Sequence, residues 1–185
     1  SGRERLFAAL APEESDPVLA ALRDLARTLE IFIHIGSLAI RLWPERAANR
    51  SFLIGPDGRI AARYDKIHLF DVNLPSGETY RESNTVAPGE EAVVATLPWA
   101  RIGFSDCYDL RFPHLYRALA KHGAEILTVP SAFTETTGKA HWHILLRPRA
   151  IENTCFVMAP AQGGEHANGR RTFGHSLIIG PWGDI

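Results

Sequence analysis

The feature that most constrains this chain is the alternation of apolar strand-like runs with helix-like stretches in its second half. Short apolar runs occupy residues 99–104, 125–129 and 155–161, and stretches that favour helices separate them at 113–122 and 140–153. Strands that alternate with helices of this length are typical of α/β proteins, in which helices cover a sheet. The sequence therefore predicts an α/β fold with mixed sheets.

The first half of the chain predicts one helix, a hairpin and a long polar connection. Asp16-Pro17 is a helix start signal, and leucines on one face extend the predicted helix through Glu30. Pro56-Asp57-Gly58 is a strong turn signal between two strand-like runs. The polar connection at 71–89 has the length of loops that are usually functional. We expect further strands at 31–39, 51–55, 59–64, 92–97 and 172–179.

Composition excludes several classes of protein. With 185 residues, 45% of them hydrophobic, the chain is long enough for one well-buried domain. A net charge of −1 gives no basic footprint for nucleic acid, and no apolar run has the length of a membrane span. The two cysteines, Cys107 and Cys155, form no disulfide framework and no CxxC zinc pair, which favours a reducing, cytoplasmic location without a structural metal. We therefore expect no nucleic-acid partner, no membrane partner, no metal and no cofactor.

Cys107 lies where the apolar strand at 99–104 runs towards the helix that begins near Pro113. A side chain on such an elbow stands clear of the sheet, and the following backbone N–H points towards the group that the side chain attacks. The position favours a nucleophilic thiol. The alternative is a small buried hydrophobe, which is the usual role of a free cysteine.

Two further residues are candidates for the same chemistry. Lys66 closes an apolar strand, where a partly desolvated ammonium can stabilise an oxyanion and help to hold a thiolate. Glu82 lies in the polar connection, whose length is typical of functional loops. Taken singly, an ordinary surface lysine and a solvated loop carboxylate are the favoured interpretations of these residues.

The order of several motifs adds a resemblance to a known family. The segments are Asp65-Lys-Ile-His-Leu-Phe-Asp71, Arg81-Glu-Ser83, Cys107-Tyr-Asp-Leu-Arg-Phe-Pro113, Pro130-Ser-Ala-Phe133 and Gly174-His-Ser176. Together they resemble the nitrilase (carbon–nitrogen hydrolase) superfamily along almost the whole chain. The stretch Arg149-Ala-Ile-Glu-Asn153 is similar to the Nit branch, which includes deaminated glutathione amidases and ω-amidases.

The resemblance implies roles for individual residues. Cys107 matches the nucleophile, Lys66 the catalytic lysine that stabilises the oxyanion, and Glu82 the glutamate that holds that lysine. The backbone N–H of Tyr108 is the expected second oxyanion donor. The remaining expected substrate-binding residues are Arg111, Phe133, Thr137, His141 and Trp142. Two interpretations of Arg111 stay open, since it can pair with a substrate carboxylate or brace the elbow through Asp109.

The resemblance also implies a fold and an activity. We expect residues 1–185 to form a single carbon–nitrogen hydrolase domain, incomplete at both ends, with the nitrilase-type four-layer α-β-β-α sandwich. The implied reaction is hydrolysis of a small carboxylate-bearing amide, either deaminated glutathione or the ω-amide of a keto acid. It would proceed with water through a cysteine thioester and release ammonia. Members of the superfamily pair through the helix after the cysteine, so a homodimer or larger homo-oligomer is expected.

Four positions depart from the family pattern. The family's general base is a glutamate in a Pro-Glu context well upstream of the lysine, and Glu13 follows a proline but lies too near Lys66. We therefore expect Glu13 to be a helix-start charge, with the true base and the C-terminal tail absent from the sequence given. Asp106 replaces an apolar residue, and its charge would oppose thiolate formation at the neighbouring cysteine. Pro148 interrupts a predicted helix and should kink it, and Gly180 replaces an acidic residue.

These departures leave an alternative open. The chain can be a cysteine amidase, or a catalytically inactive homologue with a structural or partner-binding role.

Overall fold

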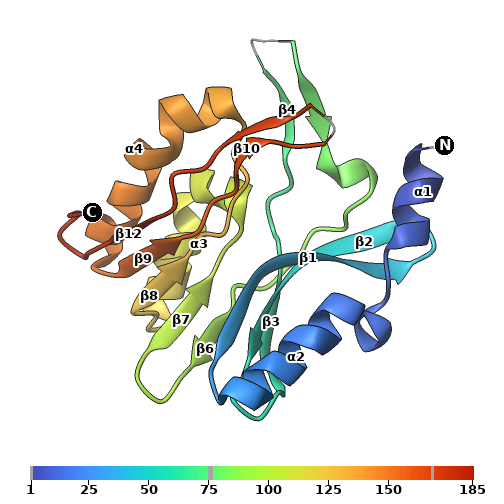
Figure 1. Cartoon of the computed structure of the whole chain (residues 1–185). Helices are drawn as coiled ribbons and strands as arrows, with labels where there is room; N and C mark the ends of the chain where they lie inside the picture. Colours follow the sequence, from blue (N-terminus) through green and yellow to red (C-terminus); the bar gives the residue numbers. More distant parts are fainter. Residues whose placement is uncertain (1, 75–76, 168) are drawn as a thin grey trace. The chain divides into compact units, whose positions relative to one another are not determined.

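The computed structural model describes residues 2–74, 77–167 and 169–185, and it comprises two compact units, Ser1–Glu91 and Ala92–Ile185 (Figure 1). Each unit has a sheet and helices of its own, in agreement with the predicted α/β class. In this described part of the chain, no helix is long and apolar enough to cross a membrane.

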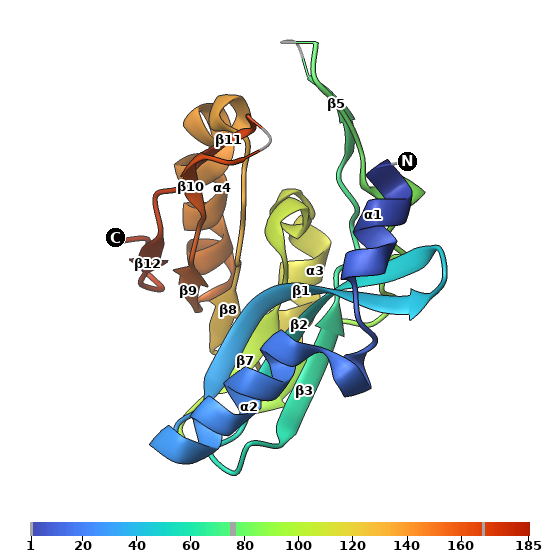
Figure 2. The ribbon, with the colours of Figure 1, turned by 45° about the vertical axis from the view of Figure 1, so that its right-hand side comes forward.

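The first unit is an antiparallel three-stranded sheet with a helix packed on it (Figure 2). The sheet has the order β1-β2-β3, and the predicted helix is α2. Side chains of α2 form a buried core with residues of β1 and β2. The Asp16 carboxylate accepts a hydrogen bond from the Leu19 N–H at 2.8 Å, as its cap position predicts. The bounds are α1 Gly2–Ala9, α2 Pro17–Leu29, β1 Ile33–Trp43, β2 Arg46–Ile54 and β3 Ile60–Asp65.

The polar connection at 71–89 has more structure than a plain loop. β4 (Asp71–Asn73) pairs with β5 (Thr79–Arg81), and a 3₁₀ helix follows at Glu82–Asn84. The Asp71 carboxylate accepts hydrogen bonds from the backbone N–H and the hydroxyl of Ser83, which fixes the start of that helix. The expectation of an unstructured connection is therefore wrong. Residues 75–76 of this segment lie outside the described residues.

The second unit is a five-stranded sheet with the order β12-β9-β8-β7-β6. Its three central strands are parallel and its two edge strands antiparallel, so the prediction of a mixed sheet is confirmed. Helices α3 and α4 connect the parallel strands, and a separate hairpin, β10-β11, follows β9. The bounds are β6 Val94–Thr96, β7 Arg101–Phe104, α3 Pro113–Lys121, β8 Ile126–Thr128, α4 Glu135–Asn153, β9 Phe156–Ala159, β10 Gly163–Glu165, β11 Arg171–Phe173 and β12 Leu177–Ile179.

Two expectations for the second unit are corrected. Helix α4 begins at Glu135, five residues before the expected start, because the Thr134 hydroxyl caps it by accepting from the Thr137 N–H. The expected strand at 172–179 is two strands, since Gly174 and His175 have φ angles of 70° and 62° and break the extended backbone. Helix α4 continues through Pro148 to Asn153.

Helix α4 packs closely against the hairpin strand β11. A Cβ atom at Gly138 would lie 2.2 Å from the Cβ of Phe173, so only glycine permits this approach. The two elements therefore form one tightly packed block.

Candidate active site

Cys107 lies directly beyond the end of β7 and begins a 3₁₀ helix, Cys107–Arg111. Its φ angle is 49°, a left-handed conformation that is uncommon for a residue with a side chain. Its backbone N–H donates to the Pro130 carbonyl at 2.9 Å, which ties the elbow to the segment after β8. The thiol is neither fully buried nor fully exposed. This strained strand-to-helix turn is the local geometry expected for a nucleophile elbow.

Buried polar residues brace the elbow from below. The Ser105 hydroxyl lies 2.7 Å from both the Thr128 carbonyl, to which it donates, and the Tyr116 hydroxyl. Burial raises the pKa of Tyr116 far above its ordinary value, a Ser105 hydrogen bond opposes that change, and the phenol stays neutral. The network fixes Ser105, two residues before Cys107, against β8 and α3.

A second brace comes from α4. The buried Arg149 guanidinium donates to the Leu110 carbonyl from Nε at 3.3 Å and from Nη2 at 2.8 Å. It also lies over the Tyr116 ring and donates to the Glu152 carboxylate. Because Leu110 belongs to the 3₁₀ helix that Cys107 begins, Arg149 fixes the far end of the elbow.

Two acidic residues flank the nucleophile position. The side chains of Asp106 and Asp109 are both buried, and the Asp109 carboxylate accepts from the Asp106 backbone N–H at 2.8 Å. Asp109 thus caps the start of the 3₁₀ helix. Asp106 is as buried as the sequence predicts, directly beside Cys107.

Arg111 lies among aromatic side chains and a histidine after the elbow, and we call this group the Arg111 wall. The Arg111 guanidinium carbon lies 5.8 Å from the Tyr108 ring centroid and 5.6 Å from that of Phe133, and its Nη2 lies 3.2 Å from Nδ1 of His141. The Phe133 ring packs on Trp142, with centroids 5.0 Å apart. The position of Arg111 beside two rings and an imidazole favours the interpretation as a carboxylate-binding residue.

The candidates Thr137 and Trp142 are held in α4. Thr137 is buried, with its hydroxyl 2.8 Å from that of Thr134. The Trp142 indole N–H donates to the carbonyl of His175, which belongs to the left-handed turn between β11 and β12, at 2.8 Å. All six expected substrate-binding residues therefore lie on the 3₁₀ helix, on α4 or just before it.

The first unit holds the other two candidates in one buried ion pair. The Lys66 Nζ donates to Oε2 of Glu82 at 2.7 Å, and the lysine side chain is only 3% exposed. The Glu82 carboxylate also accepts from the Phe70 backbone N–H at 2.6 Å and from the Asn49 amide at 3.1 Å. A carboxylate with three donors is firmly placed and in turn holds the ammonium.

The backbone around Lys66 is equally constrained. Its N–H donates to the Asn49 carbonyl and its carbonyl accepts from the Gly89 N–H, both at 2.9 Å. A Cβ atom at Gly89 would lie 2.1 Å from the Asp65 carbonyl oxygen, so the chain can close over Lys66 only because residue 89 is glycine. The expectation of a lysine that closes its strand and is withdrawn from bulk water agrees with this arrangement.

Glu13 belongs to a different cluster. It lies in a 3₁₀ helix, Glu13–Ser15, and its carboxylate accepts from Arg50 at 2.8 Å and from Arg63 at 2.7 Å. Burial acts to raise the pKa of Glu13, but the hydrogen bonds and charges of Arg63 and Arg50 outweigh it and hold the pKa below 4.5. It is the first residue of that helix, as the expected helix-start position requires, and its carboxylate is in addition engaged by two arginines.

The structure thus gathers the candidates into two groups, one in each unit, and each group is described within its own unit. The sequence did not indicate three of the supporting residues. Asn49, Tyr116 and Arg149 hold the site through contacts 33, 11 and 39 positions away in the chain. No local pattern could have signalled contacts of that range.

Comparison with known proteins identifies the family. The carbon–nitrogen hydrolase family model matches residues 2–185. This chain belongs to the carbon–nitrogen hydrolase family. It is 48% identical to the deaminated glutathione amidase of Yersinia enterocolitica over 172 residues, which is 91% of this chain and 60% of that relative.

Solved structures share the fold. Saccharomyces cerevisiae Nit3, a member of branch 10 of the nitrilase superfamily, superposes with a TM-score of 0.85 at 30% identity, covering 100% of this chain and 65% of that one. An amidase from Nesterenkonia sp. AN1, solved with the acetamide moiety of fluoroacetamide added at its active-site cysteine, gives 0.82 at 28% identity, covering 98% and 65%. The predicted nitrilase-type α/β fold is confirmed. This carbon–nitrogen hydrolase chain spans about three fifths of the length of the Yersinia relative.

Proposed function

We propose that the protein hydrolyses the carbon–nitrogen bond of a small carboxylate-bearing amide, with Cys107 as the nucleophile. The observation that carries the proposal is Cys107 itself, on a left-handed turn at the end of a parallel strand and braced by Ser105 and Arg149. Such a turn costs conformational energy, and strain of this kind is concentrated at functional sites. The relative with 48% identity is a deaminated glutathione amidase, which makes deaminated glutathione or a related ω-amide the first substrate to test.

The reaction proceeds in two stages. The Cys107 thiolate attacks the amide carbon and forms a tetrahedral intermediate, whose oxyanion is stabilised by the Lys66 ammonium and the Tyr108 backbone N–H. The C–N bond then breaks, and the nitrogen takes up the proton that the thiol gave to the proton acceptor. It leaves as ammonia or as the corresponding amine, and a thioester remains on Cys107. Water hydrolyses the thioester, which releases the carboxylic acid and restores the thiol.

The charged groups have separate tasks in this scheme. Glu82 keeps Lys66 in place and balances its charge inside the protein. Arg111, beside Tyr108 and Phe133, pairs with a carboxylate on the acyl side of the substrate. The family resemblance implies a glutamate as the proton acceptor, and Glu13 is not assigned this role because two arginines engage it.

We further propose a cytoplasmic homodimer that pairs through α3, the helix after the cysteine. The free thiols at Cys107 and Cys155 favour a reducing compartment. Light scattering after size-exclusion chromatography tests the stoichiometry, and a monomer at micromolar concentration would contradict it.

A second function has one observation in its favour. The buried Asp106 carboxylate lies next to Cys107, where a negative charge opposes thiolate formation. An inactive homologue that serves as a structural or binding partner would keep the fold and lack turnover.

One assay separates the two functions. The full-length protein and its Cys107→Ala variant are incubated with α-ketoglutaramate and with deaminated glutathione, and the release of ammonia or α-keto acid is measured. We expect turnover by the wild type and a loss of at least about 1,000-fold in the variant. Absence of turnover on both substrates would favour the inactive homologue, and equal turnover by wild type and variant would remove Cys107 as the nucleophile.

A further inference from the structure

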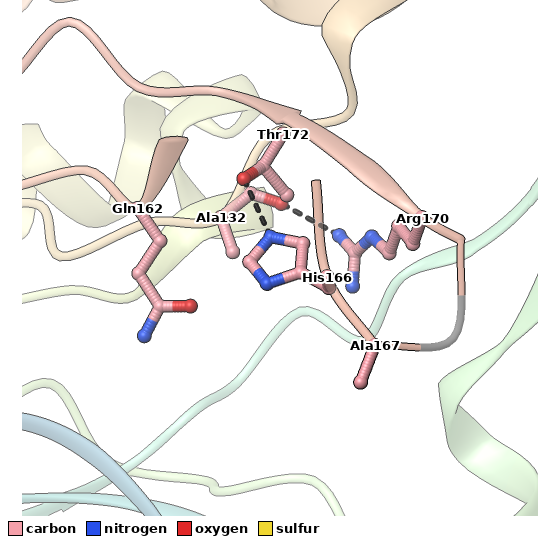
Figure 3. A pocket seen from close by; sticks show the side chains of 6 residues that line it. All are labelled: Ala132, Gln162, His166, Ala167, Arg170 and Thr172. Carbon is pink, nitrogen blue, oxygen red and sulfur yellow. Dashed lines mark hydrogen bonds between the residues drawn. The ribbon is translucent and has the colours of Figure 1, made fainter. Parts of the chain in front are cut away.

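A pocket of about 410 Å³ lies in the second unit, and its chemistry differs from that of the Arg111 wall (Figure 3). It is formed by the segment before α4, by the residue before β10 and by the β10-β11 hairpin. Its volume is in the range of small-molecule sites. The lining residues are Ala132, Gln162, His166, Ala167, Arg170 and Thr172.

The lining is suited to a carboxylate. Arg170 carries a full positive charge, Gln162 and His166 are polar, and no carboxylate is among the described lining residues. The Thr172 hydroxyl lies 2.7 Å from Nε2 of His166 and holds the ring, and Arg170 donates from Nη2 to the Ala132 carbonyl at 2.6 Å. Figure 3 shows the imidazole between Gln162 and Arg170 in this view. A guanidinium fork anchored in this way is the group best suited to bind a carboxylate.

The neighbouring arginine provides a contrast. Arg171 forms two ion pairs, with its Nε 2.8 Å from the Glu135 carboxylate and its Nη1 3.5 Å from that of Glu165. Arg170 lies just before β11 and Arg171 is its first residue, and the two side chains take different environments. The hairpin thus places one arginine in surface ion pairs and the other at the pocket.

The pocket shares a backbone segment with the cysteine elbow. The Cys107 N–H donates to the Pro130 carbonyl, and Ala132, two residues later, lines the pocket. Two residues span at most about 7 Å, which places Ala132 within roughly 12 Å of the Cys107 backbone. Backbone bonds from Gln162 to Ser131 and from Phe173 to Phe133 hold the pocket walls to that same segment.

We propose that this pocket binds the leaving group of the substrate through its terminal carboxylate, with Arg170 as the anchor. This rests on the proposed amidase function and deepens it by naming the residue that binds the leaving group when the amide nitrogen belongs to a short peptide or amino acid. Arg111 then holds the carboxylate on the acyl side and Arg170 the carboxylate on the amine side. A leaving group of two residues spans about 7 Å when extended, which lies within the limit of roughly 12 Å between the Cys107 backbone and Ala132.

The first test needs no variant. For the full-length wild type, kcat/KM is measured with deaminated glutathione and with the analogue whose terminal glycine carboxylate is a carboxamide. We expect the analogue to be about 10- to 100-fold poorer, mainly through KM, because it lacks the charge that the guanidinium binds. Equal kcat/KM for the two substrates would overturn the proposal.

The second test uses Arg170→Met, with Arg171→Met as the matched control. Arg170→Met should reduce kcat/KM for deaminated glutathione by about 10- to 100-fold and remove the preference over the carboxamide analogue. Turnover of α-ketoglutaramate, whose leaving group is ammonia, should stay within about threefold, and Arg171→Met should change neither substrate. A parallel loss on both substrates would assign Arg170 a structural role and overturn the proposal. Absence of wild-type turnover on every substrate would instead contradict the proposed function itself.

Discussion

Asp65, the last residue of β3, and Lys66, the next residue, belong to two different groups of charged side chains. One group is partly exposed and the other is buried. The Asp65 carboxylate accepts hydrogen bonds from Nε and Nη2 of Arg50, at 2.6 and 2.8 Å. Arg50 also pairs with Glu13, which in turn pairs with Arg63. Several members of this cluster are partly exposed, and the Arg63 side chain is 48% exposed. The Lys66 side chain is 3% exposed and forms an ion pair with the Glu82 carboxylate.

The difference separates a structural cluster from a functional one. Partly exposed ion pairs keep much of their hydration and add modestly to stability. A buried ammonium loses its hydration, and its pairing with a carboxylate seldom returns more than that loss, so an apolar side chain would serve the fold as well. The Lys66–Glu82 pair is therefore better explained by chemistry than by stability, whereas the Arg50 cluster joins the chain before α2 to the sheet.

The largest expected effect comes from removing the cation of each cluster. Lys66→Met should reduce kcat by at least about 100-fold with the fold retained, because the oxyanion loses its charged donor. Arg50→Met, the matched control, should leave kcat within about threefold and lower the free energy of unfolding by about 1–2 kcal/mol. Steady-state kinetics and urea denaturation measure both quantities. Near-normal turnover by Lys66→Met would remove the lysine from the chemistry.

The next effect is on stability alone and comes from His34 on β1, a buried side chain. Burial lowers the pKa of His34 from 6.5 to about 4, so the folded protein takes up this proton less readily than the unfolded chain. The free energy of unfolding should be unaffected above pH 6.5 and fall by up to about 3 kcal/mol between pH 6.5 and 4. Denaturation across this pH range measures the fall, and His34→Gln should flatten it. The same slope in the variant would show that other groups cause it.

The smallest effect is expected from Glu13→Gln. Because the folded pKa of Glu13 lies below 4.5, its stabilisation is present above pH 4.5 and is lost as the pH falls through the lowered value. The variant should lose about 1 kcal/mol or less at pH 7, decreasing with added salt, with unchanged kcat. A drop in kcat of more than about tenfold would instead identify Glu13 as a catalytic base and erase the distinction between the two clusters.

Sequence reasoning succeeded where the determinant is local. The Asp16 cap, the Pro56-Asp57-Gly58 turn and the elbow before Pro113 are each decided by a few adjacent residues, and all three occur in the structure. The positions of Lys66, Glu82 and Cys107 were inferred from motif order, and their roles remain predictions.

It failed where the local signal is weak and where distant contacts decide. The start of α4 depends on the Thr134 cap in a stretch with weak helix propensity, and the break in 172–179 depends on a left-handed His175, a residue type that rarely takes that conformation. The arginine partners of Glu13 and the Arg149 brace join residues 37 to 50 positions apart. Periodicity along the chain carries no information about such pairings.

The missing side chain at Gly138 has a consequence for selectivity. Helix α4 carries His141 beside Arg111, and β11 joins the hairpin that carries Arg170; the two elements pack at Gly138 with no room for a methyl group. This close contact leaves little room for α4 and β11 to shift relative to each other. In the proposed scheme the two arginines are therefore held at a fixed separation, and the protein would select substrates by the distance between their carboxylates.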